Sequence, residues 1–148
     1  IHSLVLTLMN AVGPQAIFTC LDRGLCADFG AERVECLIFA ESAALDAQSL
    51  APFVGAEAPA RTAFAPVLGA RSSACGMLED AQREAFDATF KGSAVVMPLL
   101  GQGWDGVIVC ASNDAGRYSA DMGTELLDYL REVATLLIAP WVKRKPQA

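Results

Sequence analysis

The chain has 148 residues, 53% of them apolar, and a formal net charge of −6 at pH 7. This length and apolar content suit one folded domain with a substantial core. Lys and Arg total 11 against 17 Asp and Glu, and the one basic cluster lies at residues 143–145, which argues against nucleic-acid binding. No apolar run approaches the roughly 18 residues of a membrane span, and the N-terminus lacks the features of a signal peptide. We therefore expect a cytoplasmic protein without a nucleic-acid or membrane partner.

The cysteines are scattered and lie in apolar segments: Cys20, Cys26, Cys36, Cys75 and Cys110. Their odd number and the absence of a CxxC pair favour buried, reduced thiols over a disulfide framework. The single histidine, His2, leaves almost no ligands for a structural zinc or a haem. We predict no metal site, and the sequence identifies no cofactor.

The N-terminal part of the chain predicts two helices and a strand. Apolar residues three and four apart predict a short helix over residues 1–9. Pro14 suits a first helical position and Gly30 suits the position after a last turn, which predicts a second helix over residues 14–29. Residues 32–40 are rich in β-formers and apolar on both parities in their second half. This pattern predicts a central strand covered on both faces.

The middle of the chain is less regular. Residues 41–71 are rich in Ala, Pro, Gly and Ser without a sustained period, which predicts short helical turns and loop. Asp80 is a suitable N-cap for a helix through residues 81–90, and Gly92 is a suitable end for it.

Two β-rich runs follow, at residues 93–100 and 104–112. They are joined by Gly-Gln-Gly, which predicts an antiparallel hairpin. Because proline cannot donate to a ladder, Pro98 must lie at an edge, a bulge or a strand end.

The last predicted element is a long helix with Ser119 as its N-cap. Its apolar stripe consists of Leu126, Leu130, Val133, Leu137 and Trp141. Pro140 should end the regular helix near Ala139. The order helix, helix, strand, irregular segment, helix, hairpin, helix predicts an α+β fold with mainly antiparallel strands.

Several stretches resemble a known family. GSAVVMPLLGQGWDGVIVCAS and RYSADMGTELLDYLREVATLLIAPW resemble the C-terminal half of a GAF domain. More narrowly, DFGAERVECLIF, GARSSACG, GSAVVMPL and RYSADMGTELL resemble the GAF-like bacterial family called domain of unknown function 484. The resemblance covers residues 1–141. Tyr118 stands where that family usually has Phe, and Ala120 where it often has Pro.

The resemblance implies a GAF-like fold for residues 1–148 as a single domain. It implies a central six-stranded antiparallel sheet, with the N- and C-terminal helices packed on one face and a small-molecule pocket on the other. It also implies a further helical segment upstream, and since the chain begins at Ile1 within a predicted helix, we expect a fragment that lacks this segment. If the pocket face were filled by the chain's own side chains, only a role in assembly would remain.

Cys75, in the stretch RSSACGMLED, is the residue with the most open interpretation. It is a reactive thiol, a pocket wall or a small apolar filler at a turn. Arg71 and the helix near Asp80 are neighbours that could lower its pKa. The ACGM turn is similar to that of a GAF-fold thiol enzyme, the free methionine-R-sulfoxide reductase, but the similarity ends at one dipeptide. A free cysteine otherwise behaves as a small hydrophobe.

The other candidates each have a binding and a structural interpretation. Arg71 is either a bidentate anchor for a carboxylate or phosphate, or a solvated loop residue. The aromatic candidates are pocket wall or plain core, and Ser112 donates a hydrogen bond to a ligand or belongs to a turn. The candidate ligand-binding set is Phe39, Arg71, Cys75, Met77, Phe86, Phe90 and Ser112.

Three functions follow from these patterns. We favour a non-enzymatic sensory or regulatory module that binds a small cytoplasmic ligand and signals through its terminal helices. The first alternative is a dimerisation or scaffold module with a vestigial pocket, and a less favoured one is a thiol enzyme using Cys75. The signatures of cyclic-nucleotide-binding and bilin-binding GAF domains are absent from the sequence. Apolar stripes on both terminal helices predict a homodimer, unless an upstream segment covers them.

Overall fold

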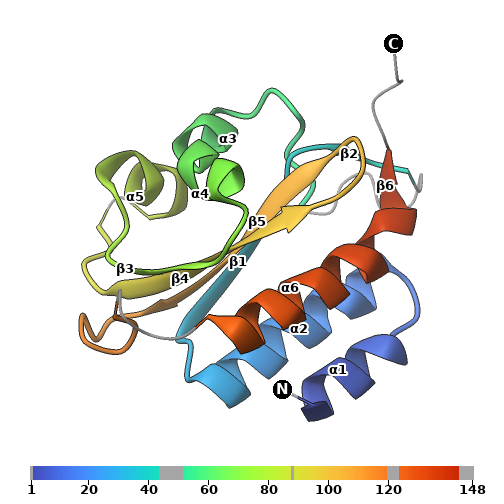
Figure 1. The fold of residues 1–148 in the computed structure, drawn as a ribbon, viewed down its shortest axis with the longest axis horizontal. Helices are drawn as coiled ribbons and strands as arrows, with labels where there is room; N and C mark the ends of the chain where they lie inside the picture. Colours follow the sequence, from blue (N-terminus) through green and yellow to red (C-terminus); the bar gives the residue numbers. More distant parts are fainter. Residues whose placement is uncertain (1, 44–51, 88, 120–123, 144–148) are drawn as a thin grey trace.

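The computed structural model describes residues 2–43, 52–87, 89–119 and 124–143 (Figure 1). Its helices are α1 (His2–Met9), α2 (Pro14–Phe29), α3 (Pro59–Ala63), α4 (Ala65–Ala70), α5 (Asp80–Phe86) and α6 (Glu125–Ile138), followed by the 3-10 turn η2 (Ala139–Trp141). Its strands are β1 (Arg33–Ile38), β2 (Glu41–Ser42), β3 (Ala74–Gly76), β4 (Ser93–Leu100), β5 (Asp105–Ser112) and β6 (Val142–Lys143). Ile1, Ala120 and the basic residues 144–145 lie outside the described residues.

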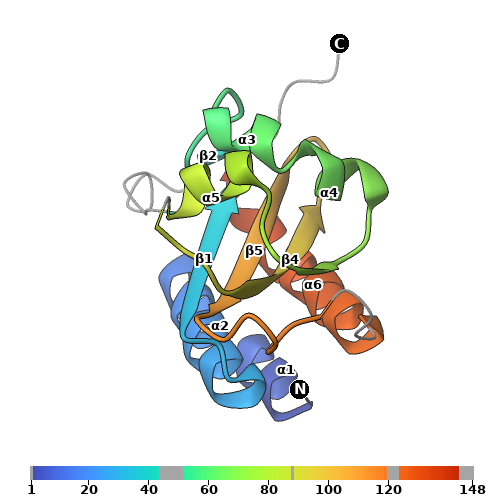
Figure 2. The ribbon, with the colours of Figure 1, turned by 90° about the vertical axis from the view of Figure 1, so that its left-hand side faces the viewer.

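The main sheet has four strands in the order β1-β5-β4-β3, and every neighbouring pair is antiparallel (Figure 2). The predicted hairpin is β4–β5, with Leu100 opposite Asp105 at its closed end. The resemblance implied six strands in one sheet, whereas the described strands divide into this sheet and a separate β2–β6 pair. The α+β class and the antiparallel pairing are confirmed, whereas a single six-stranded sheet is not found among the described strands.

Strand β1 is at the edge of the sheet, so the prediction of a central strand is wrong. Its last residues explain the pattern, because Leu37 packs in one apolar layer and Ile38 in the other. The first half of the strand is only partly buried. Double-sided burial at one end of an edge strand thus produces the same local composition as a central strand.

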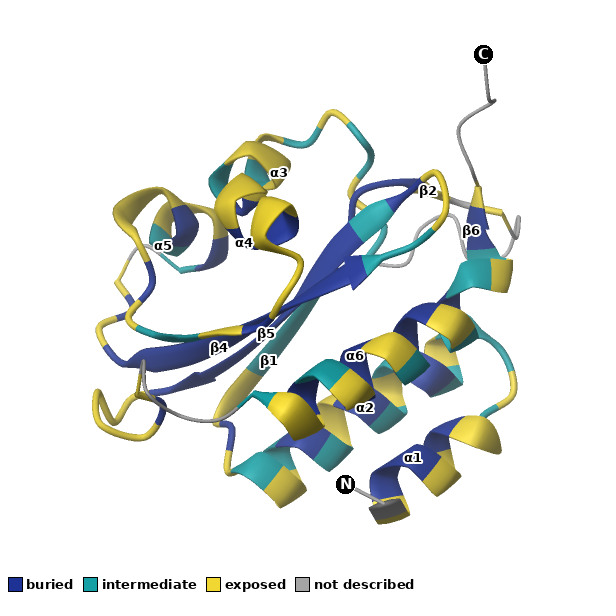
Figure 3. Cartoon of the chain, in the orientation of Figure 1, coloured by how far each residue is buried: buried dark blue, intermediate teal, exposed yellow. Residues whose placement is uncertain are grey.

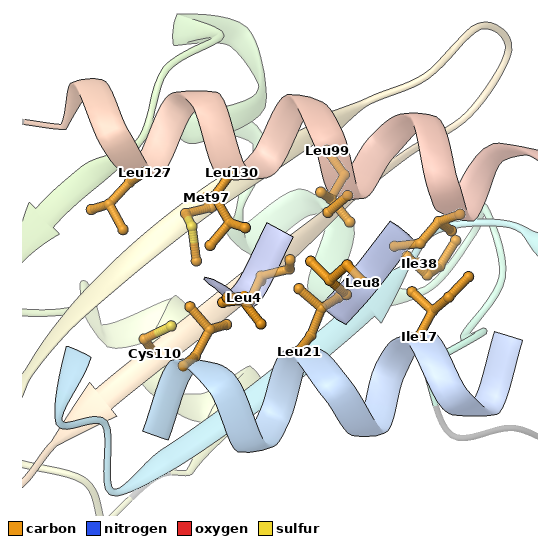
Figure 4. Packing of buried hydrophobic residues seen from close by; sticks show 14 of the residues in the cluster. Leu4, Leu8, Ile17, Leu21, Ile38, Met97, Leu99, Cys110, Leu127 and Leu130 are labelled. Carbon is orange, nitrogen blue, oxygen red and sulfur yellow. The ribbon is translucent and has the colours of Figure 1, made fainter. Parts of the chain in front are cut away.

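One face of the sheet, the helix side, is covered by α2 and α6, and α1 packs against these two helices on the side away from the sheet (Figures 1 and 4). The apolar stripes predicted for these helices meet the strand residues here. Figure 4 shows Leu130 beside Met97, and Leu8 of α1 beside Leu21 of α2. This layer confirms that the terminal helices pack together on one face.

Two glycines shape the helix side. Gly30 ends α2 with φ 65°, a left-handed conformation that glycine adopts without steric cost. A Cβ on Gly24 would lie 2.2 Å from Leu4 Cδ1, so glycine at this position lets α1 lie close against α2. Pro14 is in the first turn of α2, as predicted.

The opposite face, the front, is covered by the short helices α3, α4 and α5 (Figure 2). Phe64, between α3 and α4, is fully buried at 0% exposure, and Phe39 and Val107 are buried beneath this layer. Figure 3 shows β4 and β5 buried over most of their length. The side chains of this layer fill the centre of the front, so the expected hollow over the middle of the sheet is not found in the described part of the chain. Hollows lie around the rim of the front.

Some predicted helix ends are displaced. Glu79, and not Asp80, precedes the first turn of α5, where its N–H donates to Gln82 Oε1 at 3.1 Å. This helix ends at Phe86 instead of continuing to residue 90, because the chain becomes extended at Asp87.

The last helix, α6, begins at Glu125 after Thr124, so Ser119 does not cap it directly. Its regular part ends at Ile138 and η2 contains Pro140, as predicted. Pro98 lies in β4 beyond Val96, the last residue of β4 that pairs with β3. At Pro98, β4 pairs with β5 and no longer with β3, so one side of the strand is an edge there and tolerates a proline.

Candidate functional site

A cavity of about 250 Å³ lies at the rim of the front, between α4, β3 and α5. We call it the edge cavity, since β3 is the edge strand. Its floor is the front side of β4 at Ala94 and Val96. Its remaining walls are Pro66, Val67, Ala70, Ser72, Ser73, Ala74, Cys75, Gly76, Met77, Leu78, Glu79 and Gln82.

Strand β3 is the wall of this cavity and pairs with β4 through Ala74, Cys75 and Gly76. Cys75 lies opposite Val95 and packs against the helix-side cluster. Because side chains alternate along a strand, Cys75 borders the cavity with its backbone while its thiol lies on the α6 side. Gly76 has φ 134°, a backbone conformation that disfavours any other residue.

Polar groups in the cavity wall are few. Gln82 is buried, and its Oε1 accepts a hydrogen bond from the Glu79 N–H. Met77, 68% exposed, lies at the mouth. Apolar walls with a few hydrogen-bonding groups are typical of small-molecule sites, and this volume is slightly below the usual range of about 300–1,000 Å³.

The surroundings of the thiols raise their pKa values. Burial raises the pKa of Cys75 above its ordinary value, and the nearby Asp128 carboxylate raises it further. Burial likewise raises the pKa of Cys110 to about 12 and raises that of Cys36 still more strongly. Since the thiolate is the reactive form, this environment opposes thiol catalysis at neutral pH. Among the described residues no group of His, Cys, Asp and Glu could hold a metal ion.

A cluster of hydrogen bonds joins the turn before β3 to helix α6. Asp128 Oδ1 accepts from the Ser73 N–H at 2.9 Å, from Ser73 Oγ at 2.8 Å and from Arg131 Nε at 2.9 Å. Arg131 Nη2 also donates to the carbonyl oxygen of Arg71 at 2.8 Å. We call these four residues, Arg71, Ser73, Asp128 and Arg131, the α6 junction.

The Asp128 carboxylate in the α6 junction is paired with the Arg131 guanidinium. Burial opposes ionisation of Asp128, but hydrogen bonds from Arg131 and Ser73 outweigh it and lower the pKa of the carboxyl. Both Ser73 and Arg131 are buried, so these bonds are shielded from water. Arg71 is the one described non-glycine residue with positive φ, at 59°. Its carbonyl, and not its guanidinium, takes part in the junction.

The structure divides the predicted site residues among several places. Cys75 and Met77 border the edge cavity, and Arg71 lies beside it in the α6 junction. Phe86 and Phe90 are core residues that pack edge to face with centroids 5.6 Å apart, and the Arg33 guanidinium lies 4.5 Å from the Phe86 centroid.

Phe39 and Ser112 are separate from the edge cavity. Phe39 is buried and borders an open groove of about 530 Å³ at the closed end of the β4–β5 hairpin. We call this groove the end groove. Ser112 is buried and donates to Glu32 Oε1 at 3.2 Å. Ser112 is two residues after Cys110 in β5, so both side chains point to the helix side of the sheet, away from the edge cavity. This orientation and the bond to Glu32 agree with a structural role for Ser112.

Two larger hollows on the helix side and along α1 and α2 contain none of the predicted residues. One of about 460 Å³ lies between the sheet and the start of α6, bordered by Phe29, Cys110 and Tyr118. Tyr118 donates from its hydroxyl to the Phe29 carbonyl at 2.8 Å, a bond that phenylalanine at this position could not make. A groove of about 1,050 Å³ runs along α1 and α2 on the outside.

Sequence reasoning missed Ser73, Gln82, Asp128 and Arg131. A signal for the last two existed, because these charged residues flank Leu130 in the predicted apolar stripe of the long helix. Charged residues beside core positions are rarely buried unless they are paired. Ser73 and Gln82 carry no comparable signal in the sequence.

The four-stranded antiparallel sheet with helical layers on both faces defines an α+β domain. The chain belongs to the family described as "Protein of unknown function, DUF484", whose sequence model matches residues 1–143. The resemblance to domain of unknown function 484 drawn from the motifs is therefore confirmed. Comparison with curated proteins finds no match. No helix among the described residues is long and apolar enough to cross a membrane.

A solved structure shares this fold. It is titled "Crystal structure of a methyl-accepting chemotaxis protein, residues 122 to 287" and aligns with a TM-score of 0.57 and 16% sequence identity. The alignment covers 94% of this chain and 95% of that one. Identity at this level supports a common fold and not a common ligand.

Proposed function

We propose that this chain is a non-enzymatic, GAF-like sensory or regulatory module. It binds a small ligand in the edge cavity and passes the change to α6. The observation that carries this proposal is the α6 junction. Ser73, a residue of the cavity wall just before β3, is hydrogen-bonded directly to Asp128 of α6. The fold shared with part of a methyl-accepting chemotaxis protein supports a signalling role.

The centre of the front is filled by the chain's own side chains, a result expected to favour assembly over ligand binding. The front is not filled completely, however, and the edge cavity confines any ligand to the rim. A cavity of about 250 Å³ accommodates a molecule the size of an amino acid or a short organic acid. Gln82 Nε2 and the hydroxyl of Ser72 supply hydrogen bonds, while Val67, Leu78 and Val96 supply apolar contact. We therefore propose a small amphipathic ligand with a carbonyl or carboxylate acceptor and a short apolar body.

Thiol catalysis is the disfavoured alternative. The pKa of Cys75 is raised by burial and by Asp128, and its side chain packs toward α6. A nucleophilic cysteine needs the opposite environment, with a cation or a helix N-terminus beside it. These features support a structural role for Cys75.

A thermal-shift screen of amino acids and short carboxylates tests the proposal. A ligand at a hundred times its dissociation constant adds about 2.7 kcal/mol and raises Tm by about 5–10 °C for a chain of this size. The variant Ala70→Phe places a ring at the edge cavity and should abolish the shift, whereas Ala56→Phe, in the end groove, should retain it. A hit lost only in Ala56→Phe would move the site to the end groove, and a screen without hits would refute sensing of this ligand class.

Assembly is the second candidate function, and the exposed apolar residues of the terminal helices favour it. On α6, Leu126 is 64% exposed and Leu136 is 75% exposed, with Tyr129 between them. With the half-buried Val133 they follow the three-and-four spacing of a coiled-coil seam. Leu6 and Met9 on α1 are also exposed. A second copy of this chain would cover such a surface through a two-fold helix pair.

Sedimentation at micromolar concentrations tests this assembly. The unaltered protein should be a dimer, and Leu136→Glu should be a monomer with unchanged circular dichroism. Met77→Glu, which changes an exposed apolar residue away from the terminal helices, should leave the dimer intact. A monomeric unaltered protein would refute the homodimer.

A further inference from the structure

We infer that Asp128 and Arg131 are positioning residues that couple the wall of the edge cavity to helix α6. The inference deepens the proposed function, since it names the route from the cavity to the helix. The coupling itself is a property of the folded chain and exists whether or not a ligand is present. It can therefore be tested separately from ligand binding.

The geometry concentrates the connection on one carboxylate oxygen. Asp128 Oδ1 accepts the Ser73 N–H, the Ser73 hydroxyl and Arg131 Nε, all within 2.9 Å. Two of these donors belong to the turn that leads into β3, and the third belongs to α6. A displacement of this turn therefore stretches several charge-assisted hydrogen bonds at once.

Arg131 adds a second attachment point. Its Nη2 donates to the Arg71 carbonyl while its Nε holds Asp128. The planar guanidinium thus fixes the two ends of the turn between Arg71 and Ser73 relative to each other. Arg71 occupies a left-handed conformation that L-residues adopt at a cost, and the hydrogen bond to its carbonyl helps to hold it there.

The cavity wall is the part of the sheet best suited to move. Strand β3 has three residues and, within the main sheet, pairs with β4 alone, whereas β4 and β5 pair along eight residues. Short edge elements open at lower free energy than central strands. A ligand that favours one position of β3 therefore shifts the position of α6 through the junction, and a partner on α6 shifts ligand affinity by the same factor.

Hydrogen exchange read by mass spectrometry provides the test, without any ligand. The perturbation is Ala74→Leu, in the exposed front side of β3, and Met77→Ala serves as a milder one. Each should change exchange of α6 amides at residues 125–131 by about threefold or more. Ala56→Leu, in the end groove, and the amides of α2 serve as controls that should not change.

The same perturbations are then made with the junction weakened by Ser73→Ala or Arg131→Lys. Ser73→Ala removes one donor without altering α6, and Arg131→Lys keeps the charge but removes the planar fork. The response of α6 to Ala74→Leu should then fall to less than half. An equal response with and without the junction, or no response in the unaltered protein, would overturn the inference. A ligand screen without hits would refute the proposed function alone.

Discussion

The two faces of the sheet are covered in different ways, and the difference explains where the edge cavity forms. On the helix side, α1, α2 and α6 are joined to the strands in one continuous apolar cluster (Figure 4). On the front, three short helices cover the centre tightly around Phe64. These helices have five to seven residues, and hollows remain between them and the strands at the rim. A ligand site is thus expected where a short-helix layer ends.

The largest expected effect tests whether the centre of the front is filled. Phe64→Ala removes a fully buried ring and should cost about 3–5 kcal/mol of unfolding free energy. Leu130→Ala on the helix side should cost about 2–5 kcal/mol, which makes the faces comparable. Both are measured by urea denaturation, with the exposed Val12→Ala as a control within about 0.5 kcal/mol. A small effect of Phe64→Ala would mean that the front is hollow after all.

A pair of glycines sharpens the comparison. A Cβ on Gly92 would lie 1.7 Å from the Ser112 carbonyl oxygen, so Gly92→Ala must displace backbone and should cost about 2–3 kcal/mol. A Cβ on Gly69, in α4 of the front layer, would meet no neighbouring atom within 4 Å. Gly69→Ala should stabilise the short helix by about 0.5–1 kcal/mol. Equal effects at the two sites would contradict the described packing.

The α6 junction should make stability depend on acid pH. Because the folded-state pKa of Asp128 is lowered, its carboxylate stabilises the fold above its unfolded pKa of about 3.9, and this contribution is lost as pH falls through the folded value. Asp128→Asn should cost about 1–2 kcal/mol at pH 7 and progressively less below pH 4. Glu132→Gln, an exposed carboxylate on the same helix, serves as the charge control. A cost for Asp128→Asn that persists unchanged at pH 3 would be inconsistent with the junction.

The smallest expected effect concerns the reactivity of Cys75. Since burial and the Asp128 carboxylate raise its pKa, alkylation at pH 7 followed by peptide mapping should be several-fold slower than that of a free thiol. Asp128→Asn removes the second cause and should speed the reaction. Alkylation faster than that of a free thiol would revive the thiol-enzyme interpretation.

Much of the fold could be predicted from local chemistry. Pro14 and Gly30 mark the ends of α2, and the hairpin is evident from two β-rich runs around Gly-Gln-Gly. The edge position of β1 could not be predicted, because order within a sheet depends on long-range pairing. The cap of α5 differs by one residue from the expected one, since Glu79 and Asp80 are adjacent acidic residues and only the Gln82 contact distinguishes them.

The site could be predicted only in outline. The stretch around Cys75 does border a cavity, but the direction of its side chain depends on strand register, which the sequence does not specify. Phe86 and Phe90 have the composition of a pocket wall, yet they pack against each other in the core. The residues that join the turn before β3 to α6, such as Ser73 and Asp128, are more than 50 residues apart in the chain. Such pairs become evident only in three dimensions.

The most direct test of this account is amide chemical-shift mapping by NMR with the compound that gives the largest thermal shift. We predict perturbations in two groups, at residues 72–79 around the edge cavity and at residues 125–131 in α6. Perturbations confined to residues 39–41 and 54–58 at the end groove, or an edge cavity that responds while α6 remains silent, would contradict it.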